Sequence, residues 1–596
     1  MQTKHCQGNV IIVALILIVV VSGLVAVAVN TTNNTAHFSD RSRDVVAVQA
    51  AAEGAVDHAF AIWKSRINGQ NHALATTQAN ANLSAPTFTD ITYAPDNEDG
   101  PLKIQALDEY GAPVATPTAV MVDLQQYKGW HGKSYSYSAR AKLQLASGTN
   151  PPKVGIKRQF QYSEVPLFQA MFFFEDNLEF YRPANMIVSG LVHTNSKAYL
   201  SCDTGTELTF TGQVSYVDSY TSTDFPPFAD TWAGFVPGAT NLPVFPSGIA
   251  NQVHQVPRIE PLGTDPASAI NTTDANPNND GLRELIEPPV STFPDPPEIA
   301  KRRLYNKAGV RININGLTIT ATGQNGVALT AAQQTAITGA VTQRSSIFDP
   351  REGRNVDVAT LDISVLNTAL ASGVSGFNSV LYINDTTAST SSNTNPKTIR
   401  LKNGGVLPTN GLTVASENPV YIQGDYNTGT TTDPTAVPSN SGGNSTNTDS
   451  PTVTGYTRKP AAVIGDAVMF LSNSWSDSNA TKALGSRSAS HTTFNTAIVS
   501  GFMPSGYQPA SGSQYGYSGG GNNFPRFLEN WSGQYCTYYG SMVELYQSKI
   551  FQARWDTGTI YRPPNRCWNF DTNYSSTPPP GTLDAASMSR GSWAKY

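Results

Sequence analysis

The most apolar stretch of the chain lies near its start, where residues 10–29 contain no charged side chain. At a helical rise of about 1.5 Å per residue, this run is long enough to cross the roughly 30 Å hydrocarbon core of a membrane. A cleaved secretory signal is the alternative, because Ala26-Val27-Ala28 fits a cleavage site. Apolar residues recur at helical spacing after the run, and this pattern favours an anchored helix.

The segment after the run has the pattern of an amphipathic helix. Apolar side chains recur about one turn apart, at Val45, Val48, Ala52, Val56, Ala59 and Trp63. Ser39-Asp40 is a candidate N-cap for this segment, and the polar residues 30–35 separate it from the apolar run. We therefore expect one long helix, embedded in a membrane at first, loosened over the polar stretch and amphipathic beyond it.

The charges that flank the apolar run predict its orientation. Lys4 precedes the run, and the next charged residue after it is Asp40. Because positively charged flanks tend to stay in the cytoplasm, we expect the N-terminus there, the helix in the inner membrane and the remaining chain in the periplasm or outside the cell.

From about residue 86 the pattern becomes that of β-strands. Residues 133–145 alternate strictly, and the alternation resumes after a turn at 147–152, which predicts a β-hairpin with one buried face. Beyond residue 166 the apolar runs are short and end at Gly, Asn or Ser. Short runs at close spacing favour the stacked coils of a β-solenoid. A β-sandwich is the alternative, because long polar loops make the spacing irregular.

The expected fold is therefore mainly β: an N-terminal transmembrane and amphipathic helix, then a β-solenoid-like or β-sandwich ectodomain with an α/β insertion. The expected divisions are a leader and pilin-like helix (1–66), a small β domain with the hairpin (67–165), a first solenoid-like part (166–260), the α/β insertion (261–375), a second solenoid-like part with polar loops (376–570) and a tail (571–596).

Composition narrows the class of protein. Charged residues make up 14% of the 596 residues, against about 25% in typical soluble domains. Such a composition is typical of a β-rich exported protein. The net charge is −5 and no basic stripe is present, which argues against nucleic acid as a partner. The chain has no CxxC or Cys/His cluster, so we expect no zinc site and no cofactor.

Cys536 and Cys567 lie in one segment and are disulfide candidates in an oxidising compartment, which would leave Cys202 over. Three buried free thiols are the alternative.

Three patterns suggest chemistry, and each has a plainer interpretation. Residues 516–520 fit the GxSxG nucleophile elbow but lack the strand and helix that the elbow needs. Asp425 and Asp466 would stack as an acid/base pair on aligned coils, but Gly-Asp is also ordinary turn sequence. Residues 274–281 are Asp/Asn-rich, although Asn279 stands where a calcium loop has Gly. We therefore expect no catalytic residue and no metal site.

A polar loop is the better candidate for recognition. Residues 505–523 carry Tyr507, Tyr515 and Tyr517 among small residues. Loops on rigid scaffolds often bind partners, and tyrosines make contacts at a low cost in entropy. We predict that these three tyrosines contact a partner protein or glycan.

The N-terminal motifs resemble a known family. Gln7-Gly8 before the apolar run, Arg41 and Arg43, and Ala51-Ala52-Glu53-Gly54 resemble the N-terminus of PilX-type minor pilins. The resemblance implies cleavage after Gly8, with Asn9 as the first mature residue. It also implies packing of the exposed helix into a type IV pilus or pseudopilus. Val13 stands where major pilins carry Glu.

Motifs farther along resemble large bacterial surface proteins with such an N-terminus. They are Arg351-Glu352-Gly353 and the stretches 418–426, 460–475 and 561–566. We expect a non-enzymatic, membrane-anchored, pilin-like envelope protein that acts with other pilin-like subunits or envelope proteins in pilus assembly, adhesion or surface scaffolding. The alternatives are a membrane-tethered β-helix enzyme that processes polysaccharides and a glycan-binding protein.

Overall fold

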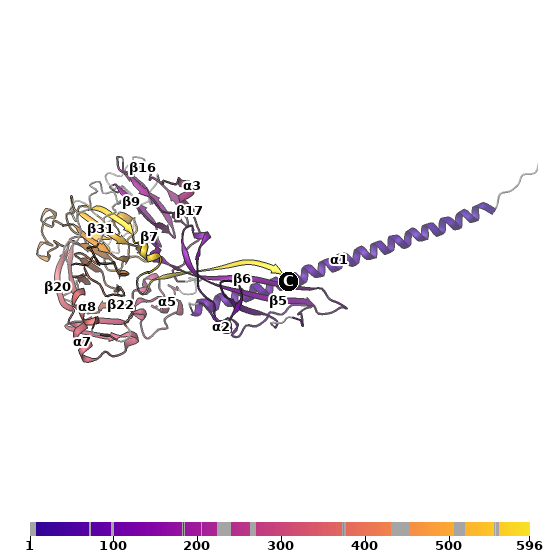
Figure 1. Ribbon diagram of the computed structural model, residues 1–596, viewed down its shortest axis with the longest axis horizontal. Coiled ribbons are helices and arrows are strands. Elements are labelled where there is room, and N and C mark those ends of the chain that lie inside the picture. The colour runs from indigo at the N-terminus through magenta and orange to yellow at the C-terminus, as the bar shows by residue number, and fades with distance from the viewer. Residues whose placement is uncertain are drawn as a thin grey trace, which may run out of the picture.

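The computed structural model is elongated: helix α1 (Gly8–Gln70) leads into two β-rich bodies that follow one another along the molecule (Figure 1). The structure describes residues 8–70, 73–96, 100–180, 183, 185–203, 205–222, 240–262, 270–371, 373–374, 377–430, 452–505, 519–553, 555 and 559–596.

Helix α1 runs without a break through the polar residues 30–35, so the expected loosening there is absent. The hydroxyls of Thr31, Thr32 and Thr35 each donate to the carbonyl four residues earlier, at 2.7, 2.8 and 2.8 Å. These bonds satisfy the side chains within the helix, so the backbone ladder continues. Ser39-Asp40 likewise lies inside α1 and does not cap a new helix.

The first β-rich body is a seven-stranded antiparallel sheet packed on the second half of α1, here called the pilin-like sheet. Its strands are β1 (Ile91–Tyr93), β2 (Lys103–Leu107), β3 (Pro113–Val114), β4 (Val120–Asp123), β5 (His131–Leu145), β6 (Lys153–Pro166) and β34 (Asp584–Lys595). The short helix α2 (Thr76–Asn80) joins α1 to the sheet. Strands β5 and β6 form the expected hairpin, in which Tyr137 pairs with Phe160.

Small and aromatic side chains together bind α1 to this sheet. Ala52, Ala55 and Ala59 are fully buried, and their small side chains allow the helix backbone to approach the strands closely. Trp63 then contacts Tyr137 edge to face, with 5.1 Å between the ring centroids.

The second body, here called the β body (residues 170–570), consists mostly of short parallel strands. Eleven strands form its longest sheet: β7 (Ala170–Phe174), β10 (Leu191–Thr194), β14 (Val214–Tyr216), β17 (Val253–Gln255), β18 (Val310–Asn315), β19 (Thr318–Gly323), β22 (Val380–Asp385), β24 (Leu412–Ala415), β26 (Ala461–Gly465), β29 (Ala497–Ser500) and β32 (Met542–Glu544).

Two further sheets complete most coils of the β body. The first contains β20 (Val341–Asp349), β21 (Arg354–Asp362), β23 (Lys397–Lys402), β25 (Val420–Gln423), β27 (Val468–Leu471) and β30 (Arg526–Phe527). The second contains β28 (Thr492–Asn495), β31 (Tyr535–Gly540) and β33 (Asn565–Phe570). Successive coils supply neighbouring parallel strands, whereas the sheets of a β-sandwich are antiparallel.

The coils near β7 are closed by smaller sheets and a short helix. These comprise β8 (Leu178–Phe180) with β11 (Lys197–Leu200) and β15 (Ser219–Thr221), β9 (Met186–Val188) with β13 (Leu208–Phe210), β12 (Cys202–Asp203) with β16 (Thr240–Asn241), and α3 (Ile249–Gln252).

The path of the chain joins the β body to the pilin-like sheet at a single place. After β6 the chain forms β7, and the following strands of the long sheet are added outward as far as β17. The chain then crosses to the other end of the sheet at β18. From there each new strand is added back toward the middle, until β32 pairs with β7. The chain then re-enters the first body as β34, which pairs with β6 (Figure 1). The β body is therefore inserted between two adjacent strands of the pilin-like sheet, and residues 584–595 of the expected tail form one of these strands.

Residues 261–375, expected as an α/β insertion, supply strands to the same sheets. They contain α5 (Pro297–Arg302), α6 (Leu304–Lys307), α7 (Ala331–Thr338) and α8 (Ile363–Ala371) besides β18 to β21. Strand β18 pairs with β22 and β21 pairs with β23, both in parallel.

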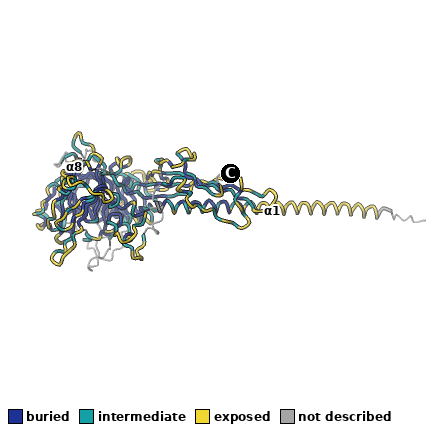
Figure 2. The backbone as a smooth tube through the Cα atoms, turned by 90° about the horizontal axis from the view of Figure 1, so that it is seen from below, coloured by how far each residue is buried: buried dark blue, intermediate teal, exposed yellow. Residues whose placement is uncertain are grey.

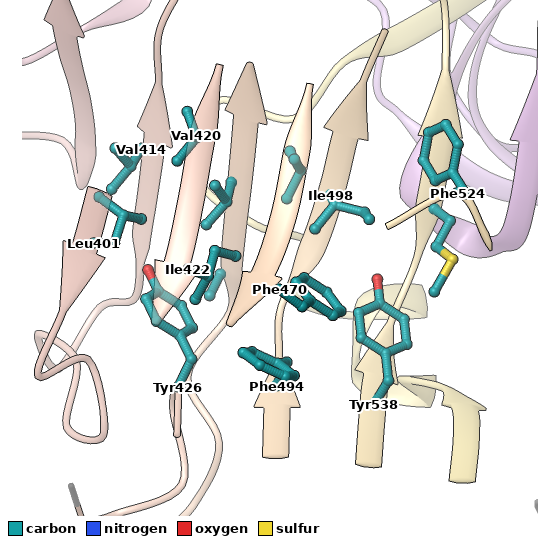
Figure 3. Packing of buried hydrophobic residues seen from close by; sticks show 14 of the residues in the cluster. Leu401, Val414, Val420, Ile422, Tyr426, Phe470, Phe494, Ile498, Phe524 and Tyr538 are labelled. Atoms are coloured by element: carbon teal, nitrogen blue, oxygen red, sulfur yellow. The ribbon is translucent and has the colours of Figure 1, made fainter. Parts of the chain in front are cut away.

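A ladder of apolar side chains fills the interior of the β body. Successive register partners along the long sheet are Leu381, Val414, Val463, Ile498, Met542, Phe172, Val192 and Val214. All eight are buried in one cluster. Opposite this ladder, Phe470 stacks on Phe494 at 4.1 Å between centroids (Figure 3). The ladder passes through the β7–β32 pair without a gap, so the interior forms one continuous core.

Candidate functional site

The first half of α1 is an exposed apolar surface. Its large apolar side chains between Ile11 and Val29 are exposed, and Figure 2 shows this half of the helix extending away from the β-rich bodies. The helix is long and apolar enough to cross a membrane. Exposed apolar area costs about 25 cal/mol per Å² in water, so a continuous surface of this length requires lipid or other apolar helices to cover it.

The second half of α1 is held by polar contacts at the edges of its apolar face. Arg158 of β6 donates to Asp57 at 2.8 Å, and Arg590 of β34 lies 3.7 Å from the same carboxylate. The Arg590 guanidinium also lies over the Phe60 ring, 4.7 Å from its centroid. Both strands that flank the inserted β body therefore contact α1.

Buried charges hold the neck, the region where the end of β6 and the start of β34 meet helices α5 and α6. Arg302 donates to the carbonyl oxygens of Asp584 at 2.9 Å, Glu298 at 3.2 Å and Leu262 at 3.3 Å. Lys307 donates to the carbonyl of Thr582 at 2.8 Å. Burial lowers the pKa of Lys307 to about 8 and raises the pKa of the Asp584 carboxyl. The neck thus fixes the strand through which the chain returns to the pilin-like sheet.

The two aspartates considered as an acid/base pair are buried and hold turns. Asp466 accepts from the backbone amides of Lys549 at 2.7 Å and Phe551 at 3.0 Å, and Arg283 donates to it at 2.5 Å. Asp425 accepts from the Thr493 amide at 2.9 Å. Their exposures are 0% and 2%, so no polysaccharide can reach either carboxylate in this conformation.

Buried glutamates have the same structural role. Glu529 accepts from the Ser472 amide at 2.7 Å and from its hydroxyl at 2.6 Å. Desolvation raises the pKa of Glu529 to about 7. Glu544, at the end of β32, accepts from the amides of Glu175 and Asp176, each at 2.9 Å, and burial raises its pKa well above the usual range. Glu544 thereby closes the β7–β32 joint.

The described residues contain no group of three or more His, Cys, Asp or Glu side chains placed to hold a metal ion. His193 is fully buried, and its ring nitrogens lie 2.8 Å from the Ser215 hydroxyl and 2.9 Å from the Asn195 side-chain oxygen. Desolvation lowers the pKa of His193 to about 4. The Asp274 carboxylate accepts from the Asn276 amide at 2.8 Å, the bond of an ordinary Asx-turn.

The expected disulfide between Cys536 and Cys567 is not formed. Both are buried thiols outside any disulfide, as is Cys202. The parallel register of β31 and β33 pairs Thr537 with Cys567, so the two cysteines point to opposite faces of the sheet. Cys536 lies in the interior cluster, and burial raises its pKa to about 12.

The remaining predicted site residues either begin α1 or lie outside the described residues. Gly8 is the first residue of α1 and Asn9 follows it in the helix. Tyr507, Tyr515 and Tyr517 lie outside the described residues, as do the first three residues of the GxSxG pattern.

Sequence reasoning missed the neck and the β7–β32 joint. Arg302 and Lys307 lie close together in the sequence, but Asp584 lies 282 positions after Arg302, and nothing in the local pattern links them. Glu544 directly follows a buried Met-Val pair, and an acidic residue at a strand end was the one available signal.

No protein-family model matches the chain, and no curated protein matches it. Among solved structures, the competence-associated pilin ComZ from Thermus thermophilus is similar over 93% of this chain and 97% of that chain, with 10% identity and a TM-score of 0.27. A likeness this distant carries no weight for the function of the chain.

Proposed function

We propose that the chain is a non-enzymatic, membrane-anchored, pilin-like envelope protein in type IV pilus or pseudopilus assembly, adhesion or surface scaffolding. One observation carries this proposal. A single helix has a first half that is apolar, uncharged and exposed, and a second half that is buried against an antiparallel sheet. The first half requires an apolar environment, whereas the second half needs none beyond its own sheet.

The geometry of the helix separates the membrane from the β-rich bodies. From Val29 to Val48, the first fully buried residue of α1, the helix rises by about 28 Å at 1.5 Å per residue. This stalk is exposed over most of its length and carries the first charges after the apolar run, at Asp40 and Arg41. A helix anchored through residues 10–29 would therefore present the ectodomain clear of the lipid headgroups, in the periplasm or outside the cell.

The proposed processing point is the bond between Gly8 and Asn9. Cleavage there would leave the whole apolar run at the start of the mature chain, free to pack among other pilin-like helices. Mass spectrometry of the protein from membranes should then identify Asn9 as the first residue, and the protein should need detergent for release. An N-terminus near Val29, with the protein free in the medium, would contradict both anchor and processing.

Assembly can be tested with a photo-crosslinking residue in place of Leu17, an exposed position of the apolar half. Crosslinks to other envelope subunits are expected at this position. The matched control is Lys482, an exposed residue of the β body, where the same probe should not give these products. Equal products at both positions would count against assembly through α1.

A further inference from the structure

A pocket of about 370 Å³ lies beside the neck, where α1 and β34 meet the segment 256–260 of the β body. This volume is within the usual range of small-molecule sites, about 300–1,000 Å³. Phe60 and Lys64 of α1, Gln126 and Tyr127 of the 3-10 turn before β5, and Ser587 of β34 line it. The pocket therefore exists only when the β body and the pilin-like sheet are both folded and in contact.

Among the charged side chains that line the pocket, Lys64 has no ion-pair partner within the described residues. Arg590 is paired with Asp57 at 3.7 Å, and Glu260 accepts from Arg258 at 3.1 Å. Lys64 is half-buried and, within the part of the chain that the structure describes, has no hydrogen-bond or ion-pair partner. A partly desolvated ammonium group gains most from a ligand that brings a negative charge.

Polar and apolar groups occupy different walls of the pocket. Gln126 donates to the Ser587 hydroxyl at 2.9 Å, and Tyr127 donates to the Arg258 carbonyl at 3.3 Å. The Ser587 hydroxyl retains its own proton for donation, and the Gln126 carbonyl oxygen can accept. Pro257 and Met588 supply apolar surface on the lining. A ligand that fits these walls has hydroxyl groups on one edge and carbon-bound hydrogens on a face.

We propose that this neck pocket binds a small organic anion with one carboxylate on a hydroxyl-bearing ring, which is the chemistry of a sugar acid. The carboxylate pairs with Lys64, the ring hydroxyls meet Gln126 and Ser587, and the ring face lies on Met588. The same chemistry is available from a free sugar acid and from the terminal uronate of an acidic polysaccharide.

The test is calorimetric titration of the full chain in detergent with glucuronate, with glucose as the neutral control and with a short oligosaccharide that ends in glucuronate. Glucuronate should bind, and glucose should bind at least about tenfold more weakly, because a hydrogen bond to a charged group is the stronger kind. Binding of the oligomer as well as the monomer points to a polysaccharide end, and binding of the monomer alone points to a free sugar acid.

Three variants separate the pocket from general effects. Lys64→Gln should weaken glucuronate binding by about 10- to 100-fold, the range expected for a charged hydrogen bond. Lys64→Arg should retain most of the binding. Lys197→Gln makes the same charge change at an exposed position in the β body and should bind like the unchanged chain. Unaltered binding by Lys64→Gln, or no glucuronate binding at millimolar concentration by the unchanged chain, would overturn the proposal. The melting temperature of each variant, measured alongside, verifies that it is folded.

Discussion

At the scale of single residues, the buried polar groups of the β body act as backbone partners. Asp466 and Glu529 accept from amides or hydroxyls of a neighbouring coil, where a turn leaves donors that no strand can satisfy. A buried carboxylate with several such bonds is expensive to remove, because each unmet amide costs about 1–3 kcal/mol. These residues are therefore as much a part of the fold as the apolar ladder.

The three cysteines that the structure describes provide the first prediction. When the protein is unfolded without reductant and alkylated, Cys202, Cys536 and Cys567 should all be modified, because none is bridged. In the folded protein Cys536 should resist alkylation at pH 8, since it is buried and its pKa is raised to about 12. Mass spectrometry counts the labels. If Cys536 and Cys567 stay unlabelled in the unfolded, unreduced chain, they form a disulfide and the prediction is wrong.

His193 provides the second prediction, a pH dependence of stability. The unfolded chain binds a proton at this ring near pH 6.5, whereas the folded protein binds it only near pH 4. The unfolded state therefore holds more protons in this interval, and the free energy of unfolding falls as the pH is lowered, by about 3 kcal/mol through this residue.

Denaturant unfolding of the unchanged chain and of His193→Gln at several pH values isolates this effect. The variant should be less stable at pH 7, because the Ser215 and Asn195 contacts change, but its stability should fall less steeply below pH 6.5. Glu529 acts in the opposite direction: its raised pKa favours the folded state below pH 7, so the comparison must be between variants and not of one curve alone. Parallel pH curves for the two chains would exclude His193 as the titrating group.

At the scale of elements, the joint between β7 and β32 is the point where the two windings of the β body meet. Besides the pairing of the two strands, the joint has the two amide contacts of Glu544 and a bond from the Ser541 hydroxyl to the Ala170 carbonyl. Burial raises the pKa of this carboxyl well above its usual range and so disfavours the charged form, and a neutral amide of the same shape can therefore substitute for it.

The third prediction follows from this geometry. Glu544→Ala leaves the Asp176 amide unmet, whereas the Glu175 amide keeps its bond to the backbone carbonyl of residue 544, so the change should lower stability by about 1–3 kcal/mol. Glu544→Gln keeps an acceptor in the same place and should cost less than about 1 kcal/mol. Hydrogen exchange of β7 measures the effect locally, and equally fast exchange in both variants would show that Glu544 does not hold the joint.

The elements that the sequence could predict are those whose pattern is local. The apolar run, the helical spacing after Val45 and the alternation of 133–145 each predicted α1 or β5 because every residue needed for the inference lies in one window. Parallel strands pair with partners tens of residues away, so the order of the long sheet, and the pairing of β7 with β32, has no local signal. The same holds for β34: its alternation is short, and its partner β6 lies more than 400 positions earlier.

The site was predictable to the same extent. Residues 10–29 were identified from hydropathy, because exposure to lipid needs no partner in the chain. The disulfide was mispredicted because separation along the chain does not reveal strand register, and register places Cys536 and Cys567 on opposite faces. The neck pocket had no signal at all, since Lys64 and Ser587 meet only through the return of the chain.

At the scale of the whole molecule, the chain consists of an exposed apolar half-helix and two β-rich bodies, one inserted into the other. The pilin-like sheet needs β34, which is available only after the β body has folded and returned the chain to β6. The β body is one continuous segment that begins at β7, directly after β6, so it interrupts the sequence of the pilin-like sheet. The exposed half of α1, by contrast, contributes nothing to either core.

The last prediction tests this division of α1. A chain that begins at Asp44 loses the exposed apolar half and the stalk, but it keeps every α1 residue in the buried cluster with the pilin-like sheet, from Val48 to Ile67. It should therefore be soluble without detergent and melt within about 2 °C of the full chain, because surface residues away from packed features change stability by no more than about 0.5 kcal/mol.

The matched control begins at Ser65 and also lacks Trp63, whose burial against Tyr137 fills the centre of the cluster. Loss of a buried Trp alone costs about 3–5 kcal/mol, so this shorter chain should lose the pilin-like sheet, and with it the β6–β34 pairing that joins the two ends of the β body. Differential scanning calorimetry of the two chains is the measurement. If the shorter chain is folded, the β-rich bodies do not need α1. If the longer chain is unfolded, the apolar half of α1 also supports the fold.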